Sequence, residues 1–204
     1  MSPMPLNLYV VDDDEAVRRS LGMLLLSRGY SVQIFESGEA FLAATHLHLN
    51  GCVILDFRLG RMNGLEVLDE MNKRNSSLVV LYLSGHGDIP AAVNAVQKGA
   101  FGWLEKPCDD DVLLEKVRQA LAHAALISKQ KTEKFEADVL WQKLTPREKE
   151  VARLVADGKT SKVIARELTA IDPRTVETHR AHAFSKLGLA NSNELDRFLR
   201  LYSL

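Results

Sequence analysis

The first half of the chain alternates short apolar runs with segments of helical periodicity, and this alternation restricts its fold more than any other feature. The apolar runs cover residues 6–11, 31–35, 52–55, 78–83 and 101–104. Helical spacing of apolar residues follows each run, over residues 15–28, 37–45, 63–73, 90–98 and from 109 onward. Strands that are apolar along most of their length are typical of a parallel sheet with helices on both faces. We therefore predict an α/β doubly wound (βα)5 domain.

The second half of the chain shows helical patterns only. Thr145-Pro146-Arg147-Glu148 resembles a capping box with a proline in the first helical turn, and Asp172-Pro173 opens another helix in the same way. Between the two halves, residues 124–143 contain no Gly or Pro and alternate in charge, which predicts an exposed helical linker. The expected helices of the second half cover residues 146–157, 161–168, 173–187 and 192–202. The expected organisation is a first domain over 1–124, a helical linker over 125–143 and an all-α domain over 144–204.

Charged residues are divided unevenly between these two domains. Residues 1–124 carry 11 Lys and Arg against 16 Asp and Glu, whereas residues 125–204 carry 15 against 11. An acidic domain joined to a basic one predicts different partners for the two, and a polyanion for the second.

The cellular compartment follows from what the sequence lacks. Cys52 and Cys108 lie far apart and without metal-ligand spacing, which favours a reducing compartment. No apolar stretch approaches the roughly 20 residues of a membrane span. The first residues also lack the pattern of a signal peptide. We therefore expect a cytoplasmic protein without a membrane partner.

Four of the five predicted strands end in side chains that can take part in chemistry. Asp12 and Asp13 follow the first strand, Asp56 the third, Ser84 the fourth and Lys106 the fifth. Because the carboxyl ends of parallel strands share one edge of a doubly wound sheet, these side chains should converge. Carboxylates at such close range require a hard cation, and Mg²⁺ with oxygen ligands fits. A lysine and a hydroxyl beside that cation predict phosphoryl transfer.

A structural role is the alternative for each of these residues taken alone. A single acid after a strand often caps the next helix, and Asp14 is interpreted in that way. The ordered combination of acids, hydroxyl and lysine on four strand ends is much harder to obtain by packing alone. This combination favours the chemical interpretation.

Four motifs of the first domain resemble the receiver domain of two-component response regulators: VVDDDEAVR, LDFRLGRMNGLEVL, LSGHGDIPAAVNAVQKGA and FGWLEKP. The resemblance covers residues 6 to about 124. It implies that Asp56 is the phosphoacceptor and that a sensor histidine kinase supplies the phosphoryl group. It also implies a Mg²⁺ ion held by Asp13, Asp56 and the backbone carbonyl of Arg58, with Asp12 acting through water.

The same resemblance assigns the remaining residues of the site. Ser84 and Lys106 would contact the phosphoryl oxygens, and Trp103 occupies the position of an aromatic switch residue. An ordinary, partly buried aromatic residue is the alternative for Trp103. The sequence departs from the family at two points. Gly60 stands where a proline is usual after the phosphoacceptor, which loosens the loop, and Trp103 is bulkier than the usual phenylalanine or tyrosine.

The helical order of the second domain, with a short turn between its second and third helices, is that of a helix-turn-helix. Its basic side chains include Lys159, Lys162, Arg166, Arg174, Arg180 and Lys186. Scattered basic residues also occur on ordinary solvated surfaces, but together with the helical order they favour DNA binding. The stretch LTPREKEVARLVADGKTSKVIARELTAIDPRTVETHRAHAFSKLGLANSNEL resembles the LuxR-type DNA-binding domain. A receiver followed by this domain is similar to the FixJ/NarL class of transcription regulators.

The resemblance to the LuxR-type domain implies individual contacts with double-stranded DNA. The residues that would face base edges are Glu177, Thr178 and Ala181. The residues that would approach phosphates are Lys162, Arg174, Thr175 and Arg180, with weaker claims for His179 and Lys186. The residues that resemble the family's dimerisation surface are Leu195, Phe198 and Leu199. Packing within one monomer is the alternative for this last group, and the two interpretations do not exclude each other.

One departure from the family lies in the turn before the third helix of this domain. Leu168 and Val176 are one residue further apart than the corresponding leucine and valine usually are, and the extra residue falls in Thr169-Ala170-Ile171. Because Asp172-Pro173 is intact, we expect a bulge within the turn. A tilted recognition helix is the alternative, and the base contacts would then fail.

The two resemblances together imply a phosphorylation-activated transcription regulator, which is no enzyme beyond catalysing its own phosphorylation and dephosphorylation. The expected partners are a sensor histidine kinase, double-stranded DNA, a second copy of the phosphorylated chain and, as a further candidate, RNA polymerase. Two alternatives stay open. A Mg²⁺-dependent phosphohydrolase would need a general acid two residues after the nucleophile, where this chain has Arg58. A constitutive DNA-binding protein would not need intact Asp56, Ser84 and Lys106.

Overall fold

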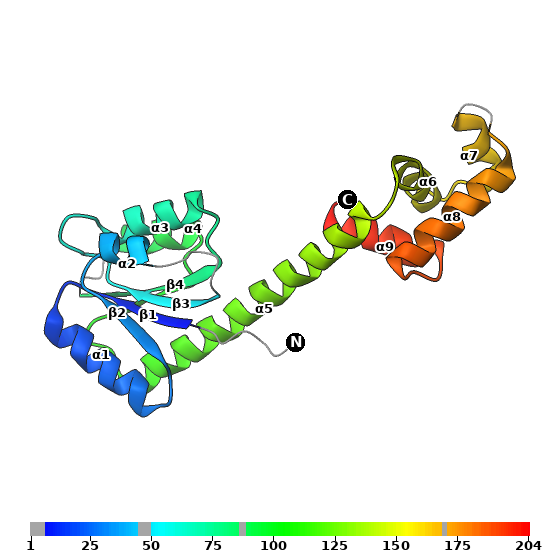
Figure 1. The fold of residues 1–204 in the computed structure, drawn as a ribbon. Coiled ribbons are helices and arrows are strands. Elements are labelled where there is room, and N and C mark those ends of the chain that lie inside the picture. The colour runs from blue at the N-terminus through cyan, green and yellow to red at the C-terminus, as the bar shows by residue number, and fades with distance from the viewer. Residues whose placement is uncertain (1–6, 45–49, 86–88, 169–170) are drawn as a thin grey trace. The chain divides into compact units, whose positions relative to one another are not determined.

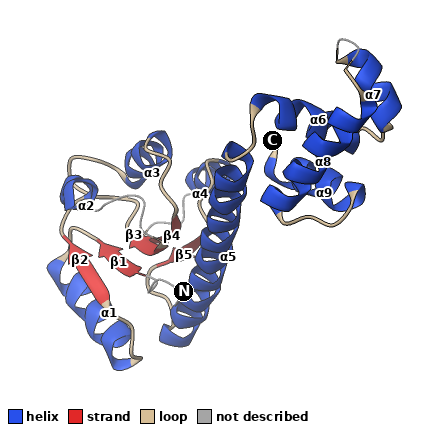
Figure 2. Ribbon diagram, turned by 45° about the vertical axis from the view of Figure 1, so that its right-hand side comes forward, coloured by secondary structure: helices blue, strands red, loops and turns tan. Residues whose placement is uncertain are grey.

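The computed structural model of the chain describes residues 7–44, 50–85, 89–168 and 171–204. Their contacts divide the chain into two compact units, Met1–Lys129 and Gln130–Leu204. The first unit holds a sheet with helices on both faces, and the described part of the second unit consists of helices and loops (Figure 2). No helix among the described residues combines the length and the apolar character needed to cross a membrane.

The five described strands of the first unit run parallel. They are β1 (Asn7–Val11), β2 (Val32–Phe35), β3 (Gly51–Leu55), β4 (Leu78–Ser84) and β5 (Gly102–Glu105). Their order in the sheet is β2-β1-β3-β4-β5, so that Val11 lies beside Leu55 and Ser84 beside Glu105. Every residue of β3 and β4 is buried, as is typical of central strands covered on both faces. The predicted doubly wound fold is confirmed.

Helices cover both faces of this sheet (Figure 1). They are α1 (Glu15–Ser27), α2 (Gly38–Ala44), α3 (Gly64–Lys73), α4 (Ile89–Gln97) and α5 (Asp110–Gln142). Helices α2, α3 and α4 pack on the face that carries Tyr82, around a core that includes Val67. Helices α1 and α5 pack on the opposite face, around a core that includes Ile54 and Val117. Two apolar cores therefore hold the strand ends in place.

Local signals in the sequence fix where the helices around the sheet begin. The Asp14 side chain accepts hydrogen bonds from the backbone N–H groups of Ala16 and Val17, so it is the N-cap that we predicted. Asn63 and Glu66 form a capping box at the start of α3. Gly64 then allows α3 to approach the sheet, because a Cβ atom there would lie 2.7 Å from the backbone oxygen of Asp56.

The second unit contains the four helices expected from the sequence. They are α6 (Pro146–Ala156), α7 (Ser161–Glu167), α8 (Pro173–Leu187) and α9 (Ser192–Tyr202). Helix α5 continues past Lys129, so the last turns of that helix belong to the second unit. Trp141 on those turns is buried in the core of the second unit, with the guanidinium of Arg153 5.5 Å from the centre of its ring. The linker segment is helical, as predicted, but this part of it is not exposed.

Glu148 joins the first and third helices of this unit. Its backbone and side chain complete the capping box with Thr145 at the start of α6, and the residue is only 3% exposed. Both carboxylate oxygens accept hydrogen bonds from the ammonium group of Lys186 on α8, at 2.9 and 2.6 Å. Burial acts to raise the pKa of Glu148, but the hydrogen bonds from Lys186 and Thr145 and the positive charge of Lys186 together outweigh burial and leave that pKa lowered.

The first prediction concerns the core of the first unit. The buried hydroxyl of Tyr9 has no hydrogen-bond partner among the residues that the structure describes, and such a group costs about 1–3 kcal/mol. Tyr9→Phe should therefore raise the free energy of unfolding in urea by about 1 kcal/mol. Tyr82→Phe is the matched control, because the Tyr82 hydroxyl donates to the Gly64 carbonyl at 2.7 Å, and it should be destabilising. Destabilisation of similar size by both substitutions would contradict the prediction.

The second prediction concerns the ion pair between Glu148 and Lys186. Glu148→Gln should lower the free energy of unfolding of the second unit by about 2 kcal/mol near pH 7, because the charged acceptor of the Lys186 ammonium group is replaced by a neutral amide. The lowered pKa of Glu148 means that this contribution is present above the ordinary pKa of a glutamate and is lost as the pH falls through the folded-state pKa. The difference between the two proteins should therefore shrink as the pH falls below the ordinary pKa of a glutamate.

Fluorescence of Trp141 in a Trp103→Phe background would follow the unfolding of the second unit alone. Glu150→Gln is the control, because Glu150 pairs with Arg147 on the solvent side at 2.7 Å and should matter little. A difference between wild type and Glu148→Gln that stays constant with pH would refute the assignment.

Candidate functional site

Three carboxylates meet at the carboxyl edge of the sheet. Asp12 and Asp13 directly follow β1, and Asp56 directly follows β3. One carboxylate oxygen from each residue lies within 4.8 Å of the other two. Asp12 is buried, Asp56 is partly buried and Asp13 is exposed, so the cluster opens to solvent on one side. Three oxygen donors at this spacing fit a hard divalent cation such as Mg²⁺.

Lys106 lies between two of these carboxylates. Its ammonium group donates to Oδ2 of Asp12 at 2.5 Å and to Oδ2 of Asp56 at 2.9 Å. Burial acts to lower the pKa of Lys106, but the hydrogen bonds that it donates to the two carboxylates and their negative charges outweigh burial, so that pKa lies above its ordinary value. Burial has the larger effect on Asp12 and raises the pKa of that carboxyl group. The pocket therefore holds a charged lysine against a buried acid.

Backbone N–H groups bind the second carboxylate oxygen of Asp12 and of Asp56. Oδ1 of Asp12 accepts from the backbone N–H of Asp14 at 2.9 Å, and Oδ1 of Asp56 accepts from the backbone N–H of Arg58 at 3.2 Å. The guanidinium of Arg18 donates to the backbone oxygen of Asp12 at 2.7 Å. This leaves Oδ2 of both residues directed toward Lys106. Arg18 is the last residue of the VVDDDEAVR motif, but its contact with Asp12 was not among the predicted ones.

Ser84 is the last residue of β4 and is buried. Its backbone oxygen accepts from the backbone N–H of Lys106 at 2.7 Å, which fixes the start of the loop after β5. Ser84 and Lys106 are thus neighbours at the same edge of the sheet as the acids. The structure brings together at one edge of the sheet the five residues that were predicted to converge there: Asp12, Asp13, Asp56, Ser84 and Lys106.

Trp103 lies on β5 and is partly buried. Its ring centre is 5.1 Å from that of Phe57 and 5.3 Å from that of Tyr82. Phe57 directly follows Asp56, so Trp103 contacts the loop that carries this carboxylate. Such a contact suits both interpretations of Trp103, the switch residue and the ordinary core aromatic.

Gly60 gives the loop after Asp56 a backbone conformation that proline cannot adopt. Its φ angle is +34°, whereas proline fixes φ near −65°. A Cβ atom at this position would meet no other atom within 4 Å, so conformation rather than space favours glycine. Leu59, the residue before it, is buried and anchors the loop. The loop after Asp56 therefore has a backbone conformation at residue 60 that a loop with proline at this position cannot have.

Both ends of the lengthened turn between α7 and α8 are anchored. The Arg147 guanidinium donates to the backbone oxygen of Leu168 at 2.7 Å, and the backbone N–H of Ile171 donates to the Ala165 oxygen at 3.1 Å. Thr169 and Ala170, where we placed part of the insertion, lie outside the described residues. Helix α8 begins at Pro173, as predicted, with Asp172 as its N-cap.

Helix α8 buries one face and exposes another. Val176, Ala183 and Leu187 point into the core of the second unit. The predicted DNA-contacting residues that are exposed are Lys162, Arg174, Thr175, Glu177, Thr178 and Ala181. Arg180 is half-buried, because its guanidinium lies 5.4 Å from the ring centre of Phe184.

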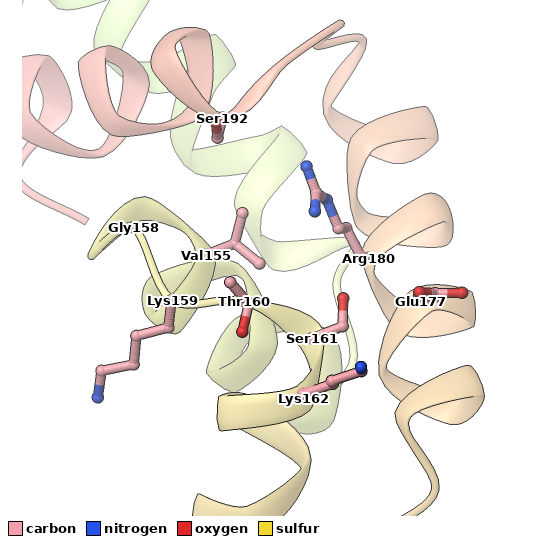
Figure 3. A pocket seen from close by; sticks show the side chains of 9 residues that line it. All are labelled: Val155, Gly158, Lys159, Thr160, Ser161, Lys162, Glu177, Arg180 and Ser192. Atoms are coloured by element: carbon pink, nitrogen blue, oxygen red, sulfur yellow. The ribbon is translucent and has the colours of Figure 1, made fainter.

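An open hollow lies where α7 begins beside α8 (Figure 3). Its polar and charged lining includes Lys159, Thr160, Ser161, Lys162, Glu177 and Arg180. Lys159 is paired with Glu167 at 2.7 Å, and Glu177 is the one acid that lines the described hollow. The basic side chains make this surface suitable for an anionic partner.

The packing of the second unit bears on the predicted roles of Lys186 and of the dimerisation residues Leu195, Phe198 and Leu199. Lys186 is held by Glu148, which speaks against a free phosphate contact. Leu195 and Leu199 are buried in the core of the second unit, which favours packing within one monomer for these two. Phe198 is partly buried, with its ring 5.3 Å from that of Tyr202, and a role in dimerisation stays a prediction.

Two protein families match the chain. The response regulator receiver domain matches residues 8–118, and the family described as bacterial regulatory proteins, luxR family, matches residues 142–199. The transcriptional regulatory protein FixJ of Azorhizobium caulinodans is 39% identical over 199 residues, which cover 98% of this chain and 94% of that protein. The tetrathionate response regulatory protein TtrR of Salmonella typhimurium is 38% identical over 190 residues, which cover 93% of this chain and 90% of that protein.

Solved structures agree with these matches. The response regulator StyR has a TM-score of 0.84 at 32% identity, and the match covers 96% of this chain and 98% of that chain. Full-length FixJ from B. japonicum has a TM-score of 0.59 at 36% identity, covering 97% of both chains. The chain therefore belongs to the response regulators that join a receiver domain to a LuxR-type DNA-binding domain.

Proposed function

We propose that the protein is a transcription regulator of a two-component system, and that a phosphoryl group on Asp56 controls its binding to DNA. The contact of Lys106 with both Asp12 and Asp56 carries the proposal, because it places a positive charge beside a potential nucleophile. We assign the receiver to residues 1–124, a helical linker to 125–143 and the LuxR-type domain to 144–204. A DNA partner also supports a cytoplasmic location.

The proposed reaction is transfer from a phosphohistidine of the sensor kinase. A carboxylate oxygen of Asp56 forms a bond to phosphorus while the bond between phosphorus and the histidine nitrogen breaks, which leaves an aspartyl phosphate. Lys106 then contacts a phosphoryl oxygen, and the Ser84 hydroxyl binds another. Apart from the Asp56 carboxylate, which takes the phosphoryl group, the residues of the site supply position and charge, and the protein turns over no separate substrate.

The same edge of the sheet would hold the metal. Asp12, Asp13 and Asp56 would bind Mg²⁺ together with the backbone carbonyl of Arg58, with Asp12 acting through water. A bound Mg²⁺ ion would neutralise charge on the incoming phosphoryl group. The exposed position of Asp13 leaves an open side from which the ion and the phosphodonor can enter.

Phosphorylation would reach the second unit by a shift in the receiver surface. Ser84 and Trp103 would move toward the phosphoryl group and bias the surface around α4 and β5. A phosphorylated chain would then pair with a second copy, through a surface that includes Phe198, and bind double-stranded DNA. RNA polymerase is the further partner that this function requires if the protein activates transcription.

The third prediction tests the phosphoacceptor. Asp56→Asn should abolish labelling by radioactive acetyl phosphate, because the amide is not a nucleophile for phosphorus at neutral pH. Asp111→Asn, which removes an exposed carboxylate on α5, should be labelled like the wild type. Labelling of Asp56→Asn to full stoichiometry would contradict the proposal.

The fourth prediction tests the metal ligands. Asp13→Asn removes one oxygen charge without unpairing Lys106, so the fold should persist while Mg²⁺ affinity falls roughly 10–100-fold. The measurement is the Mg²⁺ concentration that half-saturates the rate of acetyl phosphate labelling, and excess chelator should stop labelling of the wild type. An unchanged half-saturating concentration would remove Asp13 from the ligand set.

A further inference from the structure

The hollow in Figure 3 carries charges of opposite sign on a surface that suits a polyanion. Lys162 and Arg180 contribute positive charge. Glu177 contributes a negative charge in the same hollow. A carboxylate on a surface that approaches DNA phosphates weakens binding to every sequence alike. Its presence there requires either a structural partner or a compensating contact with the DNA.

The structure gives Glu177 no structural role. Its side chain is exposed, and it forms no ion pair or hydrogen bond with the residues that the structure describes. Asp172 already caps α8, so Glu177 is not needed at that helix start. The neighbouring cation Arg180 faces the ring of Phe184 at 5.4 Å. Nothing in the described part of the second unit therefore neutralises this carboxylate.

The position of Glu177 on α8 suits contact with bases. Helix α8 is the second helix of the helix-turn-helix, and the residues near the start of such a helix reach base edges in the major groove. Glu177 lies one residue after the buried Val176 and shares the exposed face of α8 with Thr178 and Ala181. A carboxylate accepts hydrogen bonds but cannot donate them, which restricts the bases that it can read.

Cytosine is the base whose major-groove edge fits a carboxylate best. It presents the N4 amino group as a donor, whereas guanine presents two acceptors, N7 and O6, that would repel the charge. Adenine places an acceptor beside its amino group, and thymine presents an acceptor and a methyl group.

We propose that Glu177 is a specificity-determining residue, which accepts a hydrogen bond from cytosine N4 at one position of each DNA half-site. This inference rests on the proposed DNA-binding function and adds to it the base that is read. On non-cognate DNA the same carboxylate has no donor and is repelled by phosphates. Glu177 therefore lowers affinity for wrong sequences as well as supporting the right one.

The test is selection from a randomised double-stranded DNA library with the full-length protein, treated with acetyl phosphate and Mg²⁺. The wild type should select C at one position of each half-site. Glu177→Gln should select A there, because glutamine pairs with N6 and N7 of adenine, and Glu177→Lys should select G, because lysine pairs with N7 and O6. Binding to the original and the exchanged sites should differ by about 5- to 150-fold between the variants.

Lys162→Ala is the matched control from the same hollow. It should weaken binding to all sequences about equally and leave the selected motif unchanged, because a phosphate contact carries no sequence information. Thermal unfolding should be unchanged in the Glu177 variants, since this side chain is exposed. A motif shared by the wild type, Glu177→Gln and Glu177→Lys would overturn the inference and leave the proposed function intact. A wild-type protein that selects no motif would overturn the proposed function itself.

Discussion

The ammonium group of Lys106 between Asp12 and Asp56 is the contact on which the receiver unit depends. Two carboxylates at this range repel each other unless a cation lies beside them. Lys106 lies 94 positions from Asp12 and 50 positions from Asp56 in the sequence. The three residues meet because β1, β3 and β5 end at one edge of a parallel sheet. Gly64 allows α3 to lie against the loop that carries Asp56. The backbone hydrogen bond from Lys106 to Ser84 fixes the position of the lysine backbone. The fold is thus the means of placing one positive charge beside a carboxylate that can accept a phosphoryl group.

The second unit depends on an ion pair between a buried glutamate and an exposed lysine. Glu148 lies on α6 and Lys186 near the end of α8, so their contact joins α6 to the end of that helix. Arg147, the neighbour of Glu148, holds the backbone at the end of α7. Two adjacent residues at the start of α6 therefore fix both sides of the helix-turn-helix. Arg147 on α6 and Ala165 on α7 thus anchor the two described ends of the turn that holds the extra residue.

The sequence predicted the arrangement of elements better than the contacts between them. The alternation of apolar runs and helical patterns was enough to predict the order of strands and helices. The positions of Asp12, Asp56 and Lys106 at strand ends were enough to predict that these residues lie close together. The partner of Glu148 could not be predicted, because the capping box is a local signal and Lys186 lies 38 residues away. Trp141 was expected on an exposed linker, since charge alternation does not reveal that one side of a helix meets another core. The role of Gly60 depended on a φ angle that composition does not specify.

Control of the second unit by the first is the central proposal, and one binding measurement tests it directly. The affinity of the full-length protein for its selected DNA site should be measured at fixed salt, before and after treatment with acetyl phosphate and Mg²⁺. We expect treatment to tighten binding by the wild type about 5- to 150-fold, the usual range of coupling between sites, and to leave Asp56→Asn unchanged. Equal affinity of the wild type in both states, at full phosphorylation, would show that the receiver does not control DNA binding.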